Sequence, residues 1–141
     1  MQRKQSGGVV YIRKATLYND YFRREMWTGQ HMQITVMSIP VGGEVGKEIH
    51  DNLDQFLVVE QGAASVFMGD KADALCFVGE ATEGAGILVP SGTYHNVVND
   101  GRIPLKLFSV YAPPKHPIGT LQRSKADADR EESEGSDGSA D

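Results

Sequence analysis

The sequence predicts an all-β fold, either a β-sandwich or a small barrel, formed by one domain. The apolar runs are short and mostly alternate with period two, which is typical of strands. Turn signals rich in glycine and proline separate these runs, and no stretch shows a long helical period. A chain of 141 residues is the size of one domain and can bury roughly two-thirds of the surface that its unfolded form exposes, so it needs no cross-links to fold.

The predicted strands follow one another from residue 31 onward. Residues 1–30 form an N-terminal arm with one or more strands, and within them residues 16–24 fit either a short helix or a strand. In residues 31–39, Met32, Ile34 and Val36 share one face because side chains alternate across a strand. The further strands are predicted at residues 56–60, 64–68, 75–78, 86–89, 93–98 and 105–111.

A β-hairpin is predicted at Gln61–Gly62. The runs 56–60 and 64–68 flank this short link, and glycine adopts the positive φ that tight hairpin turns require.

The C-terminal segment is predicted to be an acidic, disordered tail. Residues 124–141 hold seven acidic and two basic residues, which accounts for the whole net charge of −5, so the remainder of the chain is formally neutral. The segment has no aromatic or β-branched residue with which to form a core. We therefore place the folded domain at residues 31–118 and the tail at 119–141. A neutral domain offers no electrostatic footprint for a nucleic acid, so none is expected as a partner.

The compartment is predicted from what the sequence lacks. The single cysteine, Cys76, excludes an intramolecular disulfide and a zinc site built from several cysteines. It is expected to be a small buried apolar residue. The N-terminus has no apolar segment of signal-peptide length, and no apolar run approaches the roughly 20 residues of a membrane helix. These features predict a cytoplasmic protein without a membrane partner.

Candidate metal ligands lie in two places. In an extended segment Glu48 and His50 project from one face, because residues two apart point the same way. Asp54 and Gln55 begin the next strand, and one of the two should return to that face. His95 follows a turn at residues 90–92. Carboxylate, imidazole and amide or second carboxylate donors form a mixed nitrogen and oxygen site that suits divalent iron, manganese, nickel or zinc.

The same residues also have a purely structural interpretation. A histidine on a strand is often held by hydrogen bonds in the interior, and acids such as Asp51 and Asp54 are common in turns. From the residues alone, both interpretations stay open.

One segment resembles the second motif of the cupin superfamily at every fixed position. That motif is a glycine, five residues and then P-x-G-x-x-H-x-x-x-N, and here Gly84, Pro90, Gly92, His95 and Asn99 occupy it.

The first cupin motif, G-x5-H-x-H, three or four residues, E, six residues, G, is matched with two changes. Gly42 opens it, Glu48 replaces the first histidine, His50 is the second, and Gln55 stands in place of the glutamate. Gly62 closes it. The chain also resembles a set of small single-domain cupins with an E-x-H-x-x-x-D-Q-F signature and a Y-A-P-P end, here residues 48–56 and 111–114. Members of that set are often labelled mannose-6-phosphate isomerase-like.

The resemblance implies a jelly-roll β-barrel or sandwich with a divalent metal near its centre. Carried over position by position, the metal ligands are Glu48, His50, Gln55 and His95, and Asp54 would replace Gln55 if the latter turned outward. With Gln55, the ligands carry a formal charge of −1 and a divalent ion brings it to +1, which favours an anionic substrate.

Three functions remain open at this point. The leading one is a metal-dependent enzyme, isomerase- or epimerase-like, acting on a small polar or anionic metabolite such as a sugar or sugar phosphate, with Asp54 as the nearest candidate for a catalytic base. The alternatives are an iron-dependent dioxygenase and a non-catalytic small-molecule-binding cupin. A homodimer is expected on fold grounds, because residues 9–12 form an apolar arm that can pair with a neighbouring sheet.

Overall fold

The computed structural model describes residues 5–138, with side-chain detail through residue 134. Strands dominate, as the sequence predicted. The elements are α1 (Ile12–Tyr18), β1 (Arg23–Thr28), β2 (Gln33–Ile39), β3 (Asp54–Gln61), β4 (Ala64–Gly69), β5 (Cys76–Ala81), β6 (Gly86–Val89), β7 (Tyr94–Val98), β8 (Leu105–Ala112), β9 (Leu121–Gln122) and α2 (Lys125–Gly138). No helix of residues 5–138 is long and apolar enough to cross a membrane.

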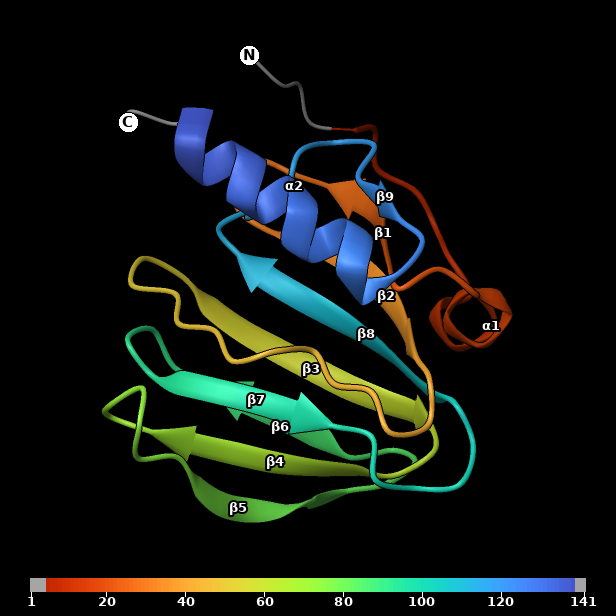
Figure 1. The fold of residues 1–141 in the computed structure, drawn as a ribbon. Coiled ribbons are helices and arrows are strands. Elements are labelled where there is room, and N and C mark those ends of the chain that lie inside the picture. The colour runs from red at the N-terminus through yellow and green to blue at the C-terminus, as the bar shows by residue number, and fades with distance from the viewer. Residues whose placement is uncertain (1–4, 139–141) are drawn as a thin grey trace.

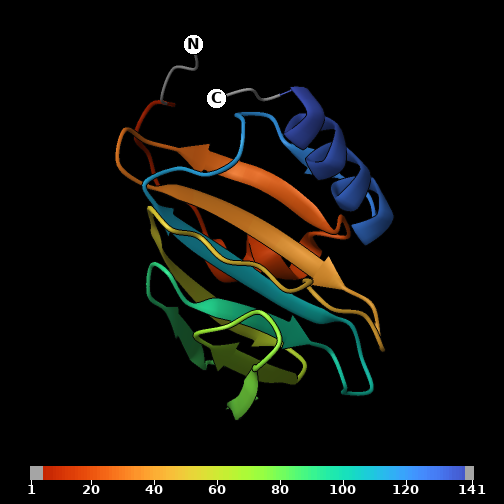
Figure 2. The ribbon, with the colours of Figure 1, turned by 60° about the vertical axis from the view of Figure 1, so that its left-hand side comes forward.

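The strands form two antiparallel sheets that face each other. The larger has the order β6-β3-β8-β2-β1-β9, and the smaller has the order β5-β4-β7 (Figures 1 and 2). Among the described strands the two sheets do not close into a barrel, so the sandwich form of the predicted jelly roll is the one observed. Residues 43–48 widen the smaller sheet, because they run beside β7 and exchange backbone hydrogen bonds with it.

The hairpin predicted at Gln61–Gly62 is wrong. β3 pairs with β6 and β8 in the larger sheet, whereas β4 pairs with β5 and β7 in the smaller one. The link therefore turns the chain from one sheet to the other. Gly62 has a φ of +92°, and a Cβ there would lie 3.1 Å from the Pro104 carbonyl oxygen and 3.2 Å from the Leu105 Cα. The glycine signal was correct for a turn, but local sequence does not say which sheet the next strand joins.

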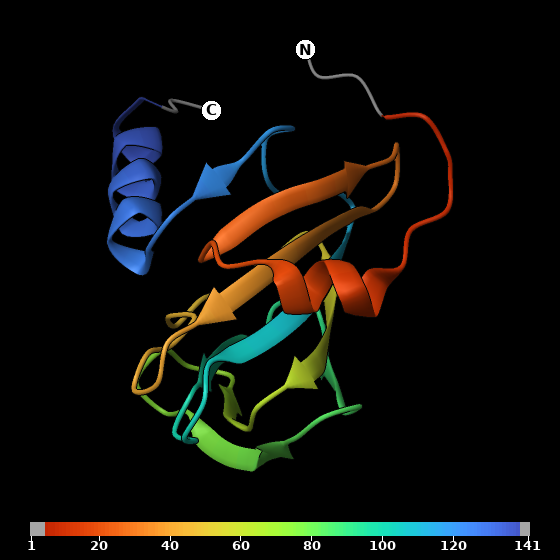
Figure 3. The ribbon, with the colours of Figure 1, turned by 90° about the vertical axis from the view of Figure 1, so that its right-hand side faces the viewer.

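The helices lie on opposite sides of the larger sheet (Figure 3). α1 packs against β8, β3 and β2 on the outer face, so residues 16–24 contain the end of a helix and the start of β1. α2 follows β9 near the sandwich interior, where Ala128 joins the apolar core.

The acidic segment differs from the predicted disordered tail over residues 119–134. β9 pairs with β1, and α2 begins directly afterwards. The helix has local reasons to form, because the Ser124 hydroxyl accepts a hydrogen bond from the Asp127 amide as an N-cap and Lys125 bonds Asp129 one turn on. Residues 139–141 of the predicted tail lie outside the described residues.

The inner face of the larger sheet is divided into an apolar end and a polar end. The apolar end carries the core, and its buried side chains include Met37, Ile39, Leu57, Val59, Leu105 and Leu107. Toward the other end the inward positions are polar and equally buried: Arg23, Glu25, Thr28, Gln33, Thr35, Gln55, Ser109 and Tyr111. Burial of a polar group costs folding free energy unless the group is hydrogen-bonded or binds a ligand. We therefore expect the functional site at the polar end.

Cys76 is exposed at the start of β5, which corrects the expectation of a buried residue. β5 is an edge strand of the smaller sheet, and its first three residues are all exposed.

Candidate metal centre

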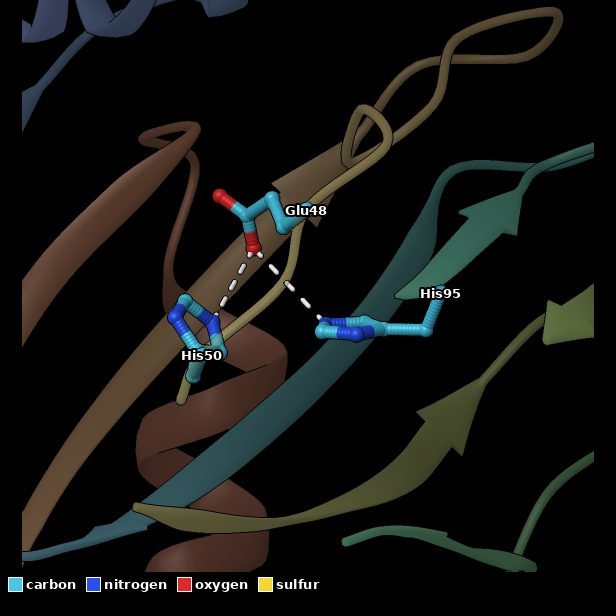
Figure 4. Close-up of side chains that lie close together, drawn as sticks. All are labelled: Glu48, His50 and His95. Carbon is cyan, nitrogen blue, oxygen red and sulfur yellow. Dashed lines mark ion pairs between the residues drawn. The ribbon is translucent and has the colours of Figure 1, made fainter. Parts of the chain in front are cut away.

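Glu48, His50 and His95 meet at the polar end of the interior. Each offers one ligand atom, and these atoms all lie within 4.8 Å of one another. Oε1 of Glu48 is 3.5 Å from Nε2 of His50 and 3.9 Å from Nε2 of His95. Figure 4 shows the carboxylate between the two imidazoles, with His95 on β7 and the other two on the segment before β3.

Backbone pairing brings the three side chains together. The Glu48 amide donates to the His95 carbonyl and the His95 amide donates to the Glu48 carbonyl, both at 2.9 Å. Residues paired in this way present their side chains on one face, so Glu48 and His95 are neighbours by register. His50 follows two residues later, and its carbonyl accepts from the Gly92 amide at 2.8 Å. The two cupin motifs therefore meet along one backbone ladder.

His95 is held as a neutral ligand. Its Nδ1 lies 3.0 Å from the Thr93 carbonyl oxygen, which can only accept, so Nδ1 carries the proton and Nε2 has a free lone pair facing the cluster. Burial lowers the pKa of the imidazole, outweighing the Thr93 bond and the Glu48 charge, which favour the protonated form.

Glu48 is held as a carboxylate. Burial acts to raise its pKa, but His50 and the positive charge of Arg23, followed by His95, outweigh burial and lower the pKa to about 2. An ionised carboxylate beside a neutral imidazole is the state in which both are metal ligands.

Unpaired polar atoms mark the same region. Among the described residues, five buried side-chain atoms have no hydrogen-bond partner: Arg23 Nε, Thr35 Oγ1, His50 Nε2, Gln55 Oε1 and His95 Nε2. All five belong to the polar end. Buried imidazole nitrogens without partners, converging on a carboxylate, fit a divalent metal of borderline character.

Gln55, predicted as a fourth ligand, turns toward the interior of the sandwich. It is buried on the inner face of β3, opposite Tyr111 of β8, and the Tyr111 ring lies 6.1 Å from the His50 ring. Its Nε2 donates to Ser109 Oγ at 2.8 Å, which fixes the amide and leaves Oε1 unpaired.

Asp54 is not brought to the cluster. It is exposed on the opposite side of β3 from Gln55, and its Oδ1 accepts from the Ser91 amide at 2.9 Å. The Ser91 hydroxyl in turn donates to the Asp51 carbonyl at 2.7 Å. These contacts secure the turn that carries the second motif toward β7.

Asn99, the last fixed position of the second motif, has a structural role. It is fully buried, and its amide donates to the carbonyls of Ile39 and Ile103 at 2.9 and 3.0 Å.

The sequence analysis missed two residues beside the cluster. Tyr111 is fully buried, and burial raises the pKa of its hydroxyl. His116 lies outside both motifs, yet it is half-buried and its Nε2 lies 3.3 Å from the Tyr111 hydroxyl. Its placement depends on Gln33, whose Oε1 accepts from the His116 amide and whose Nε2 donates to the His116 carbonyl. No motif spacing signals such a contact across more than 80 residues.

Comparisons with known proteins agree with this arrangement. The chain is 52% identical over 120 residues to the uncharacterized protein YrkC of Bacillus subtilis, a match covering 85% of this chain and 64% of that protein's length. The crystal structure of BH2720 from Bacillus halodurans matches with a TM-score of 0.87 and 51% identity, over 89% of this chain and 95% of that one.

A more distant structure shares the fold alone. A cupin-superfamily sugar phosphate isomerase from Silicibacter pomeroyi matches with a TM-score of 0.50 and 17% identity, over 60% of this chain and 52% of that one. The family model described as "Cupin domain" matches residues 35–111, which run from β2 through β8 and include all three residues of the cluster. This chain therefore belongs to the cupin family.

Proposed function

We propose that the protein holds one divalent metal ion at Glu48, His50 and His95, with Gln55 as the fourth ligand, and acts as an enzyme on a small polar or anionic metabolite. The observation that carries the proposal is the pair of buried, unpartnered imidazole nitrogens facing one carboxylate oxygen. Iron, manganese, zinc and nickel all suit this donor set.

The reaction class we propose is isomerisation or epimerisation. When bound, a divalent ion in such a site polarises a carbonyl or hydroxyl oxygen of the substrate. The sugar phosphate isomerase among the structural neighbours supports this class by fold. The metal ligands leave room in the coordination sphere, since three or four protein donors do not complete an octahedral set.

The chain supplies a proton-transfer pair close to the cluster. The hydroxyl of Tyr111 and Nε2 of His116 are 3.3 Å apart, and the two rings are 5.2 Å apart. Burial lowers the pKa of His116 to about 3, so at neutral pH its imidazole is neutral and its Nε2 can accept a hydrogen bond from the Tyr111 hydroxyl. We propose this pair for the role that the sequence suggested for Asp54, whose carboxylate is engaged at the Ser91 turn.

The first test is the metal content of the purified protein. We expect about one equivalent per chain, lost in His50→Ala and in His95→Ala because each removes one of the three convergent donors. His31→Ala is the matched control, since His31 is exposed and outside the cluster. A chain that stays metal-free after reconstitution would contradict the proposal.

The second test is whether the metal-loaded protein turns over sugar phosphates or keto acids. Turnover is measured as isomer formation and as exchange of substrate protons with deuterated water. Exchange or isomer formation that disappears in His116→Gln would support an isomerase. Bound metal without exchange on any compound would favour the binding-protein alternative.

A further inference from the structure

Arg23 is a buried cation without an ion pair. Arg23 is only 4% exposed to solvent, yet no carboxylate of the described residues lies within 4.0 Å of its guanidinium nitrogens. Within residues 5–138 its side chain makes one hydrogen bond, from Nη1 to Gln122 Oε1 at 2.8 Å, and its guanidinium carbon lies 5.3 Å from the centre of the Phe22 ring, while Nε has no hydrogen-bond partner there. A guanidinium has five N–H donors, so most of its capacity is unused.

The neighbouring carboxylates are engaged elsewhere. Glu25, two residues along the same face of β1, accepts at Oε2 from the Thr28 hydroxyl and at Oε1 from the Gly119 amide. Glu48 lies against the two histidines. Neither acid is therefore free to move to Arg23 without leaving another buried group unpaired.

Arg23 faces the candidate metal centre. It lies on the inner face of the larger sheet, opposite Met37 of β2, where the apolar core gives way to the polar end. Its charge acts on Glu48 of the cluster and on Tyr111 and His116 beside it. Two residues before Met37 on β2 and opposite Glu25, Thr35 presents a buried hydroxyl beside that of Tyr111.

An unpaired buried charge is costly, and an anionic ligand would remove that cost. Two parallel N–H donors of a guanidinium match the two oxygens of a carboxylate. One guanidinium, helped by one neutral hydroxyl, can neutralise the charge of a monoanion such as a carboxylate. A phosphate dianion would need more than one cation for the same neutralisation.

We propose that Arg23, assisted by Thr35, binds the carboxylate of a small organic acid whose other oxygen faces the Glu48, His50 and His95 cluster. This inference rests on the proposed function for its second half, the oxygen at the metal. The anion-binding half stands on Arg23 itself. The substrate class thereby narrows from polar metabolites in general to small carboxylic acids.

The test is calorimetric titration with organic acids of two to six carbons, including 2-hydroxy and 2-oxo acids, each beside its neutral amide. We expect at least one acid to bind more tightly than its amide by about tenfold or more, the scale of a charge-assisted hydrogen-bond pair. The inference is overturned if no acid exceeds its amide, or if inorganic phosphate binds more tightly than every carboxylate.

Variants then assign the preference to Arg23. In Arg23→Gln the acid should bind about as weakly as the amide. Arg23→Lys should recover part of the affinity difference between acid and amide, because it restores the positive charge but not the two parallel N–H donors. Arg24→Gln, the exposed neighbour, should bind like the native protein.

A purely structural role for Arg23 predicts a different pattern. It predicts that Arg23→Gln lowers the melting temperature of the ligand-free protein and leaves the acid preference intact, whereas our inference predicts a melting temperature that is unchanged or higher. Titrations of metal-free protein separate the two proposals. An acid preference that persists without metal, in a chain that never takes up metal, would sink the proposed function and keep Arg23 as an anion site.

Discussion

Gln55 decides the charge of the candidate metal centre. A glutamine donor leaves Glu48 as the one anionic ligand, and the amide is oriented by Ser109 with Oε1 unpaired. We expect Gln55→Glu to bind Mn²⁺ about tenfold or more tightly, because it adds a negative donor, and Gln55→Met to bind it more weakly because it offers no oxygen. Competition with a fluorescent chelator measures both. Equal affinities in all three proteins would place Gln55 outside the coordination sphere.

His116 makes the stability of the protein depend on pH. Its pKa is about 3 in the folded state against 6.5 in the unfolded chain, so between these values the unfolded state binds a proton that the folded state does not. Its contribution to stability is therefore complete above pH 6.5 and decreases as the pH falls toward 3. We expect His116→Gln to reduce the loss of unfolding free energy between pH 7.5 and pH 5 by about 1 to 2 kcal/mol.

Urea titrations at the two pH values, in the presence of a chelator, measure this difference. His31→Gln serves as the control, because that histidine is exposed. An unchanged pH dependence in His116→Gln would show that the folded imidazole titrates normally.

The sequence predicted the clustering of Glu48, His50 and His95 better than the surroundings of the cluster. Alternation along an extended segment was enough to put Glu48 and His50 together, and motif spacing added His95. Alternation also left Asp54 and Gln55 as alternatives, and the fold turned Gln55 inward. Arg23 and His116 could not be assigned, because their positions depend on pairing between strands or loops that lie 80 to 100 residues apart in the chain, such as Arg23 with Gln122.

At the scale of elements, the corner between β3 and β4 is a sensitive point. Gly62 combines a φ of +92° with backbone atoms at 3.1 and 3.2 Å from the position of an added Cβ. Gly84 has a similar φ of +87° with nothing within 4 Å, so it is a control for the conformational strain alone. We expect Gly62→Ala to cost about 1 to 2 kcal/mol more unfolding free energy than Gly84→Ala. Equal costs in denaturant titrations would mean that the corner relaxes freely.

Strand positions were predictable because period-two alternation is a local property. The seven strands expected from residue 31 onward all occur, with ends shifted by at most three residues. Assignment of strands to sheets is not local, and for that reason the hairpin prediction failed. The acidic helix was missed for another reason: composition alone excluded a core, but one residue, Ala128, suffices to anchor its first turns.

At the scale of the whole molecule, self-association remains a prediction. Val9, Val10 and Tyr11 are exposed ahead of α1, with Val9 94% exposed. We expect the chain to sediment at twice its mass of 15.4 kDa at micromolar concentration, and Val10→Lys with Tyr11→Lys to shift it toward the monomer. A monomer for the native chain would exclude the dimer, and a dimer that survives both substitutions would exclude the arm as its interface.

The division of the inner face into an apolar and a polar end also bears on how such a protein can diverge. Most core side chains lie toward one end of the inner face and most polar side chains toward the other, although Leu57 is level with Thr35 and Arg23 is level with Met37. Substitution of a polar side chain on this face leaves the core side chains of Leu105 and Leu107 themselves unchanged. Arg23 or Thr35 can therefore be exchanged for other polar residues during evolution. Such an exchange changes the ligand that the protein accepts, with little effect on its folding stability.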